Sequence, residues 1–136
     1  IIFLCSWVCD TFAYCTGMLC NKTIGTHKLA AKLSPKKSIE GAVGGVAGSV
    51  ILGLLYGWLA GDGLSHLENP AVVIAIICGV GAVISQIGDL AASAIKRNYD
   101  IKDYGRLIPG HGGILDRFDS VIFTAPIIYF LAEMMM

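Results

Sequence analysis

The sequence predicts an all-α fold, a polytopic membrane helix bundle with about four transmembrane helices. The chain has 136 residues, of which 55% are hydrophobic and only 15% are charged, whereas a soluble domain typically carries about 25% charged residues. Its mean hydropathy is +0.71. Four apolar stretches approach the length of about 20 residues that a helix needs to cross a bilayer. The net charge is zero, which excludes a generally basic surface for nucleic acid.

The first predicted span covers residues 1–20 and contains one acidic residue, Asp10. A carboxylate is costly in hydrocarbon, so Asp10 should face protein or water and not lipid. Asp10, Tyr14 and Gly17 have the spacing i, i+4 and i+7. We therefore expect these three residues to lie along one side of the first helix.

The segment 21–40 is polar and carries five lysines. This excess of positive charge predicts a loop on the cytoplasmic side of the membrane. Within the segment, Ser34-Pro35 predicts either a turn or a helix start with Pro35 at the first helical position.

Residues 41–60 form the second predicted span. Its glycines recur four residues apart, as in Gly41 and Gly45 or Gly53 and Gly57. Small residues at this spacing let helix backbones approach closely in lipid. We interpret the pattern as a packing signal with no catalytic role. The turn that follows, 61–69, contains no Lys or Arg.

The third predicted span, residues 70–93, becomes polar in its second half. Asp89, Ser93 and Lys96 follow one another at i, i+4 and i+7, so they share a face that points toward the next polar segment. Asp89 could be a buried carboxylate paired with a cation. Acidic residues within a membrane are expensive and usually functional, so we favour a metal or substrate role.

The fourth predicted span covers residues 118–136. With four spans, the polar segments 21–40 and 94–117 lie on the same side of the membrane, and together they hold all ten Lys and Arg residues. The positive-inside rule places both segments in the cytoplasm. We expect one transmembrane catalytic domain, residues 1–136, with a polar site on its cytoplasmic side.

The segment from Ser93 to Asp119 holds five cations and four aspartates between two apolar stretches. Carboxylates that hold a metal and cations that hold phosphates together suit a metal–nucleotide complex. Asp116 and Asp119 are three residues apart at the start of the fourth span, so both carboxylates face one way and could coordinate Mg²⁺. The alternative for Asp116 is a helix N-cap or an interaction with the helix dipole.

A glycine-rich turn, from Pro109 to Gly113, precedes the fourth span. The backbone N–H groups of such turns can cradle an anion. His111 in this turn either contacts a phosphate or has only a structural role, and the residues leave both interpretations open.

The stretch SAIKRNYDIKDYGRLIPGHGGILDRFD, residues 93–119, resembles the signature of phosphatidate cytidylyltransferases, also called CDP-diacylglycerol synthases. That signature runs S-x-apolar-K-R, four residues, K-D, a glycine-containing link, P-x-H-G-G, apolar-x-D-R-apolar-D. The residues that match it are Ser93, Lys96, Arg97, Lys102, Asp103, Gly105, Pro109, His111, Gly112, Gly113, Asp116, Arg117 and Asp119. Segments 10–17, 34–41 and 85–89 also resemble parts of the family, so the resemblance spans almost the whole chain. Family members are longer at the N-terminus, and this chain resembles their C-terminal catalytic part.

The resemblance implies conversion of CTP and phosphatidic acid to CDP-diacylglycerol and pyrophosphate, a step of phospholipid biosynthesis. It implies Mg²⁺ as cofactor, with K⁺ as an option at a paired site. The metal candidates are Asp89 and Asp116, which match the family's metal site, and then Asp119 and Asp10. The catalytic candidates are Asp89, Lys96, Asp116 and Arg117. The candidates for substrate binding are Ser34, Lys37, Arg97, Lys102, Asp103, His111, Gly112 and Gly113.

Two other functions stay open. A CTP-dependent lipid or polyprenol kinase would transfer the γ-phosphate of CTP instead of the CMP group. An ion-coupled transporter would use Asp10 and Asp89 within the membrane, but it would leave the basic, glycine-rich loop without a purpose. The expected partners are CTP, phosphatidic acid and the lipid bilayer, with no nucleic acid and with a homodimer as an open question. The expected location is the bacterial inner membrane, because no organelle-targeting segment is visible.

Overall fold

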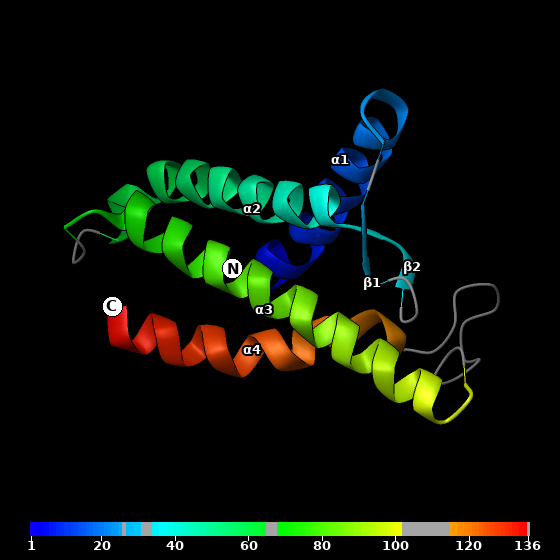
Figure 1. Ribbon diagram of the computed structural model, residues 1–136. Helices are drawn as coiled ribbons and strands as arrows, with labels where there is room; N and C mark the ends of the chain where they lie inside the picture. Colours follow the sequence, from blue (N-terminus) through cyan, green and yellow to red (C-terminus); the bar gives the residue numbers. More distant parts are fainter. Residues whose placement is uncertain (26, 31–33, 65–67, 102–114, 136) are drawn as a thin grey trace.

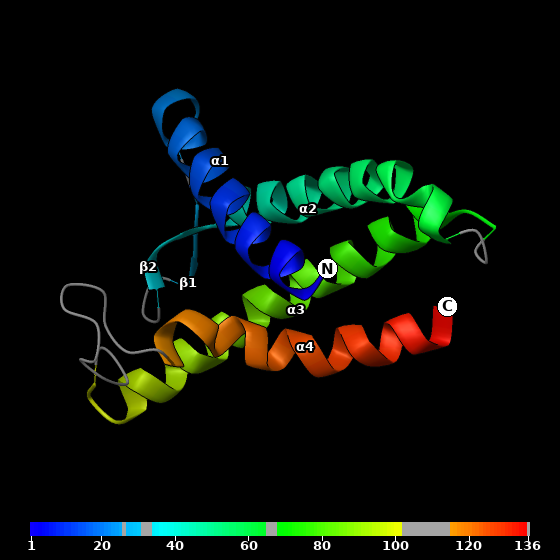
Figure 2. The same ribbon diagram turned by 180° about the vertical axis from the view of Figure 1, so that it is seen from behind.

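The computed structural model describes residues 1–25, 27–30, 34–64, 68–101 and 115–135, and it confirms the all-α membrane bundle. Three long helices, α2 (Ile39–Leu59), α3 (Pro70–Asn98) and α4 (Leu115–Met135), lie side by side in both ribbon views. A fourth helix, α1 (Cys9–Thr23), is inclined to them (Figures 1 and 2). A short π-helical segment, η1 (Leu4–Val8), leads directly into α1.

Three helices of the described residues are long and apolar enough to cross a membrane, namely Ile39–Leu59, Pro70–Asn98 and Phe118–Met135. The first predicted span is helical too, but α1 alone has 15 residues. A helix of that length is shorter than the roughly 20 residues that cross the hydrocarbon core. Its last residues, from Asn21 to Thr23, are polar and exposed.

The segment 21–40 forms more structure than the predicted loop. Strand β1 (Lys28–Ala30) pairs antiparallel with strand β2 (Ser34–Ser38), with Lys28 opposite Ser38. The prediction of a turn or a helix start at Ser34-Pro35 is therefore wrong. Proline is tolerated there because both strands of a two-stranded ladder are edge strands.

Helix α2 begins at Ile39, and its N-cap is Ser38. The Ser38 Oγ accepts a hydrogen bond from the backbone N–H of Gly41 at 3.0 Å, which satisfies one of the free amides at the helix start. In the next element, η2 (Gly61–Leu64), one turn of 3₁₀-helix follows the end of α2. Helix α3 then starts with Pro70 at its first position, where a missing N–H costs nothing.

The glycines of α2 are packing positions, as the sequence predicted. A Cβ added at Gly45 would lie 2.7 Å from the carbonyl oxygen of Cys9, so the backbones of α1 and α2 approach closely there. At Gly53 an added Cβ would lie 2.9 Å from the Cβ of Cys78 in α3. The two halves of α2 thus use small residues against two different helices.

Helix α3 is the centre of the bundle and packs against both α2 and α4. Its buried residues Ile74, Ile77 and Cys78 form the apolar core together with Cys5 and Ile128. Many other apolar side chains of the spanning helices are exposed, as expected for helices that face lipid.

The polar elements gather at one end of the bundle (Figure 1, right). There the strand pair, the end of α3 and the start of α4 lie near one another, whereas η2 and the C-terminus lie at the opposite end. Helix α3 continues to Asn98, so Lys96 and Arg97 occupy its last turn instead of a loop. We call the end that carries the strand pair the polar end.

Candidate active site at the polar end of the bundle

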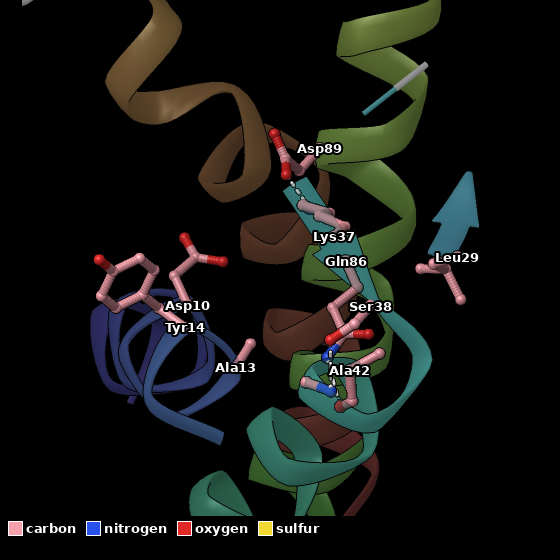
Figure 3. A pocket seen from close by; sticks show the side chains of 10 residues that line it. Asp10, Ala13, Tyr14, Leu29, Lys37, Ser38, Ala42, Gln86 and Asp89 are labelled. Atoms are coloured by element: carbon pink, nitrogen blue, oxygen red, sulfur yellow. Dashed lines mark hydrogen bonds and ion pairs between the residues drawn. The ribbon is translucent and has the colours of Figure 1, made fainter. Parts of the chain in front are cut away.

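A cavity of about 230 Å³ opens at the polar end, between α1, the strand pair, the start of α2 and α3 (Figure 3). Elements far apart in the sequence meet around it. Its lining residues are Asp10, Ala13, Tyr14, Leu29, Lys37, Ser38, Gly41, Ala42, Gln86 and Asp89. It is the place where predicted site residues from three separate segments come together.

Lys37 and Asp89 form an ion pair across this cavity, from β2 to α3 (Figure 3). Their side chains are half-buried, with exposed fractions of 28% and 26%. The pair joins the basic segment 21–40 to the acidic residue of the third span. The Lys37 ammonium lines the cavity, where a ligand can reach it, and Asp89 compensates its charge.

Asp10 lies across the cavity from this pair, on α1, next to Tyr14 (Figure 3). Both residues come from the helical face that the i, i+4 spacing predicted. Gly17, the third residue of that face, packs against Ser38, because an added Cβ would lie 3.0 Å from the Ser38 Oγ. The same face of α1 thus supplies two cavity residues and a contact with the start of α2.

Gln86 was not predicted as a site residue, although it belongs to the polar second half of the third span. Its Nε2 donates to the carbonyl oxygen of Ala42 at 2.9 Å and to the Cys9 Sγ at 3.1 Å. It therefore connects α3 to both α2 and α1 at the wall of the cavity. A polar amide one turn from Asp89 in an apolar helix was the signal that could have identified it.

Lys96 and Asp119 form a second ion pair, which joins α3 to α4 with the Nζ and Oδ2 atoms 3.7 Å apart. Their side chains are largely buried, with exposed fractions of 15% and 10%. The backbone N–H of Ser120 also donates to the Asp119 Oδ1 at 2.7 Å. Neither residue of this pair lines the cavity.

The remaining predicted residues are placed less completely. Arg97 is exposed in the last turn of α3. Ser34 belongs to β2, and Asp116 and Arg117 belong to the first turn of α4, but their side chains lie outside the described part of the chain. The predictions for Lys102, Asp103, His111, Gly112 and Gly113 fall on residues outside the described ranges.

The donors of the cavity fit a magnesium ion. Mg²⁺ prefers oxygen ligands and is usually held by one or two carboxylates together with water and substrate phosphates. Asp10 and Asp89 supply two carboxylates to one cavity. Within the described ranges, no three His, Cys, Asp or Glu residues lie close enough to hold a metal ion unaided. A metal here would therefore depend on further oxygen ligands, such as phosphates.

Comparison with known proteins assigns the chain to a family. The model of the Cytidylyltransferase family matches residues 1–135. A phosphatidate cytidylyltransferase of Bacillus subtilis (strain 168) is 42% identical over 125 residues, which cover 92% of this chain and 43% of the relative. A phosphatidate cytidylyltransferase of Synechocystis sp. is 39% identical over 136 residues, which cover 100% of this chain and 43% of the relative.

A third relative, the phosphatidate cytidylyltransferase of Rickettsia felis, is 40% identical over 136 residues, covering 97% of this chain and 57% of the relative. The chain thus spans about half the length of the curated relatives it matches. Because the family model covers nearly all of the sequence, the chain belongs to the cytidylyltransferase family.

Proposed function

We propose that the protein to which this chain belongs transfers the CMP group of CTP to phosphatidic acid, giving CDP-diacylglycerol and pyrophosphate. The relatives carry the name phosphatidate cytidylyltransferase. The observation that carries the proposal is the cavity at the polar end of apolar helices, where two aspartates and a lysine from α1, β2 and α3 meet. A charged cavity at the end of membrane-spanning helices suits a lipid phosphate and a nucleotide.

The reaction needs positioning more than proton transfer. The nucleophile is a phosphate oxygen of the lipid, which is already anionic near neutral pH, so no strong general base is required. The difficulty lies in bringing two polyanions together and in stabilising charge on the departing pyrophosphate. Lys37 lines the cavity and would exchange part of its contact with Asp89 for a phosphate. Arg97, Lys102 and Arg117 are the further phosphate-binding candidates, whereas Lys96 is buried against Asp119.

Asp10 and Asp89 would hold a magnesium ion in this cavity, with Asp116 as a further ligand and K⁺ at a paired site. Bound Mg²⁺ supplies positive charge that offsets the charge of the phosphates. Asp89 would orient the ion from α3, and Asp10 would do so from α1. Tyr14 and Gln86 complete the polar wall beside these carboxylates.

The polar end would face the cytoplasm, most simply of a bacterial inner membrane, since the compared relatives are bacterial proteins. The strand pair of the segment 21–40 and the last turn of α3, which holds Lys96 and Arg97, lie at this end. Positive charge next to spanning helices favours the cytoplasmic side. In this orientation water-soluble CTP reaches a lipid whose acyl chains stay in the bilayer.

The test is an assay of the full-length protein in membranes with radiolabelled CTP, phosphatidic acid and Mg²⁺, with and without a chelator. We expect labelled CDP-diacylglycerol and released pyrophosphate, and we expect both to disappear on chelation. Release of CDP with a phosphorylated lipid would instead identify a CTP-dependent lipid kinase. Absence of any labelled lipid from folded protein would overturn the proposal.

A further inference from the structure

Three buried serines from three separate elements meet inside the bundle. The Ser6 Oγ of η1 and the Ser120 Oγ of α4 are 2.8 Å apart, and the Ser85 Oγ of α3 donates to the Ser6 Oγ at 3.3 Å. Ser6 and Ser85 are fully buried, and Ser120 is 4% exposed. We call this group the serine junction. It joins η1, α3 and α4 through side-chain hydrogen bonds within the apolar part of the chain.

Other buried hydroxyls of the described residues do not join helices in this way. The Ser49 Oγ donates to the Gly45 carbonyl of its own helix at 3.0 Å. The Thr124 Oγ1 donates to the Ser120 carbonyl of its own helix at 2.7 Å. A hydroxyl that donates to a carbonyl of its own helix is satisfied without a hydroxyl partner on another helix. The serine junction is different because each of its hydrogen bonds joins two elements. Each bond therefore depends on how far one element is shifted along its axis relative to the other.

Each serine of the junction lies four residues from an aspartate that the sequence predicts as a metal ligand. Ser6 precedes Asp10, Ser85 precedes Asp89, and Ser120 follows Asp116. In an α-helix four residues correspond to about one turn, so Ser85 with Asp89 and Ser120 with Asp116 each lie on one face with an axial offset of roughly 6 Å. Ser6 lies in the π-helical segment that leads directly into α1 and Asp10. Helix α3 runs toward the polar end and α4 runs away from it (Figure 1). On both helices the aspartate is therefore the partner nearer to the polar end.

We infer that Ser6, Ser85 and Ser120 are positioning residues, which hold the three helices at the register that brings Asp10, Asp89 and Asp116 to one level. Sliding one helix by a turn would separate buried hydroxyls, and an unpaired hydroxyl in an apolar environment is unfavourable. Interhelical hydrogen bonds between serines are also a recognised way to fix helices in lipid. The inference rests on the proposed function, since it gives these aspartates a common role as cation ligands.

The junction also adjoins the second ion pair. The backbone N–H of Ser120 donates to the Asp119 Oδ1, and the other carboxylate oxygen of Asp119 faces Lys96. The serine junction thus lies one turn below the cavity carboxylates and directly beside the link between α3 and α4. A substitution of Ser120 should therefore affect both the cavity carboxylates and the Lys96–Asp119 ion pair.

The experiment measures Mn²⁺ binding, as a spectroscopic substitute for Mg²⁺, by electron paramagnetic resonance of the full-length protein in nanodiscs. The variants are Ser120→Ala and Ser85→Ala, with Ser49→Ala as the matched control, because Ser49 is equally buried but donates to a carbonyl of its own helix, beside Cys9 and outside the junction. We expect the junction variants to bind Mn²⁺ about tenfold more weakly, the lower end of the effect of groups that orient metal ligands. The control should bind like the unmodified protein.

A double variant separates positioning from simple packing. Because Ser6 takes part in both hydrogen bonds of the junction, Ser6→Ala combined with Ser120→Ala should weaken Mn²⁺ binding no more than Ser6→Ala alone. If Ser120→Ala does not fold, Ser85→Ala decides, since it removes the longer bond and leaves the Ser6–Ser120 contact in place. Strictly additive losses, or junction variants that bind Mn²⁺ as the Ser49→Ala control does, would overturn the inference.

The result also separates this inference from the proposed function. Mn²⁺ binding that depends on the junction, without formation of CDP-diacylglycerol, would support positioning and refute cytidylyl transfer. If CDP-diacylglycerol forms and the junction variants bind Mn²⁺ like the unmodified protein, cytidylyl transfer would be supported and the positioning inference refuted. Protein that is folded but binds no Mn²⁺ would overturn the positioning inference, because its aspartates would not form a cation site.

Discussion

Two Lys–Asp pairs at the polar end use the same chemistry in different surroundings. Lys37 and Asp89 line the cavity and keep about a quarter of their side-chain surface exposed. Lys96 and Asp119 lie between α3 and α4 and are largely buried. A pair that solvent reaches can exchange one partner for a ligand, whereas a buried pair is costly to open because its charges then lose compensation. We therefore predict that ligands engage the first pair and that the second pair holds α3 and α4 in position.

The largest effect should follow from Asp89→Asn, which keeps the size of the side chain and removes its charge. We expect the rate of CDP-diacylglycerol formation to fall by a factor on the order of 1,000, as when a group that stabilises charge in the reacting state is lost. The measurement is kcat in membranes with saturating CTP and Mg²⁺. The thermal stability of the protein should change little, because a quarter of the Asp89 side chain is exposed and asparagine still offers an acceptor to Lys37.

The matched control for this variant is Asp100→Asn. Asp100 is exposed just beyond α3 and has a positive φ of 53°, a conformation that asparagine also adopts readily. The control should keep normal activity. Equal losses in both variants would show that negative charge in general, and not the cavity carboxylate, is what the reaction needs.

The next largest effect concerns the buried pair. Replacing Lys96 with Met removes the cation beside Asp119 and should lower the free energy of unfolding by about 3 kcal/mol, the lower end for breaking a buried ion pair. Unfolding in mixed detergent micelles measures it. Arg97→Met is the control, because Arg97 follows Lys96 in the same helical turn but is exposed. If both variants lose the same stability, burial does not distinguish the two pairs.

A smaller effect is expected for Lys37→Ala. The KM for CTP should rise about tenfold, as typical for the loss of one charge-assisted contact to a phosphate, while kcat and stability change less. Lys28→Ala serves as the control, because Lys28 is exposed on the neighbouring strand and does not line the cavity. A variant that lowers kcat without changing KM would move Lys37 from ligand binding to the reaction itself.

The sequence predicted the cavity region better than the contact between α3 and α4. Asp10 and Asp89 stand out as acidic residues in apolar stretches, and charge distribution alone predicted that they approach one polar end. The strand pair was missed because strands of three and five residues, KLA and SPKKS, are too short and too irregular to show an alternating apolar pattern. The ion pair of Lys96 with Asp119 was missed for another reason. Spacing along one helix predicts a shared face but does not identify the partner on the neighbouring helix.

The serine junction shows what kind of signal was available but not used. Serines four residues from an aspartate recur in three predicted spans, and each serine alone is unremarkable in a membrane helix. Only the packing of η1, α3 and α4 shows that the three hydroxyls meet. Likewise, the spacing of glycines in α2 predicted close packing, but not that its two halves face different helices.

The smallest effect is expected for the contact of His27 with Glu40, whose side chains are 85% and 28% exposed and which extends the comparison to a pair with one largely exposed partner. The His27 Nδ1 lies 2.8 Å from the Glu40 Oε1, and the backbone N–H of His27 also donates to the Glu40 carboxylate. The His27 side chain is 85% exposed. Glu40→Gln keeps an acceptor oxygen for these donors, and a charged contact with a largely exposed partner contributes little, so neither stability nor activity should change measurably. A measurable loss of stability would show that the pair orders the strand pair at the mouth of the cavity, and that exposure alone does not decide which charged contacts matter here.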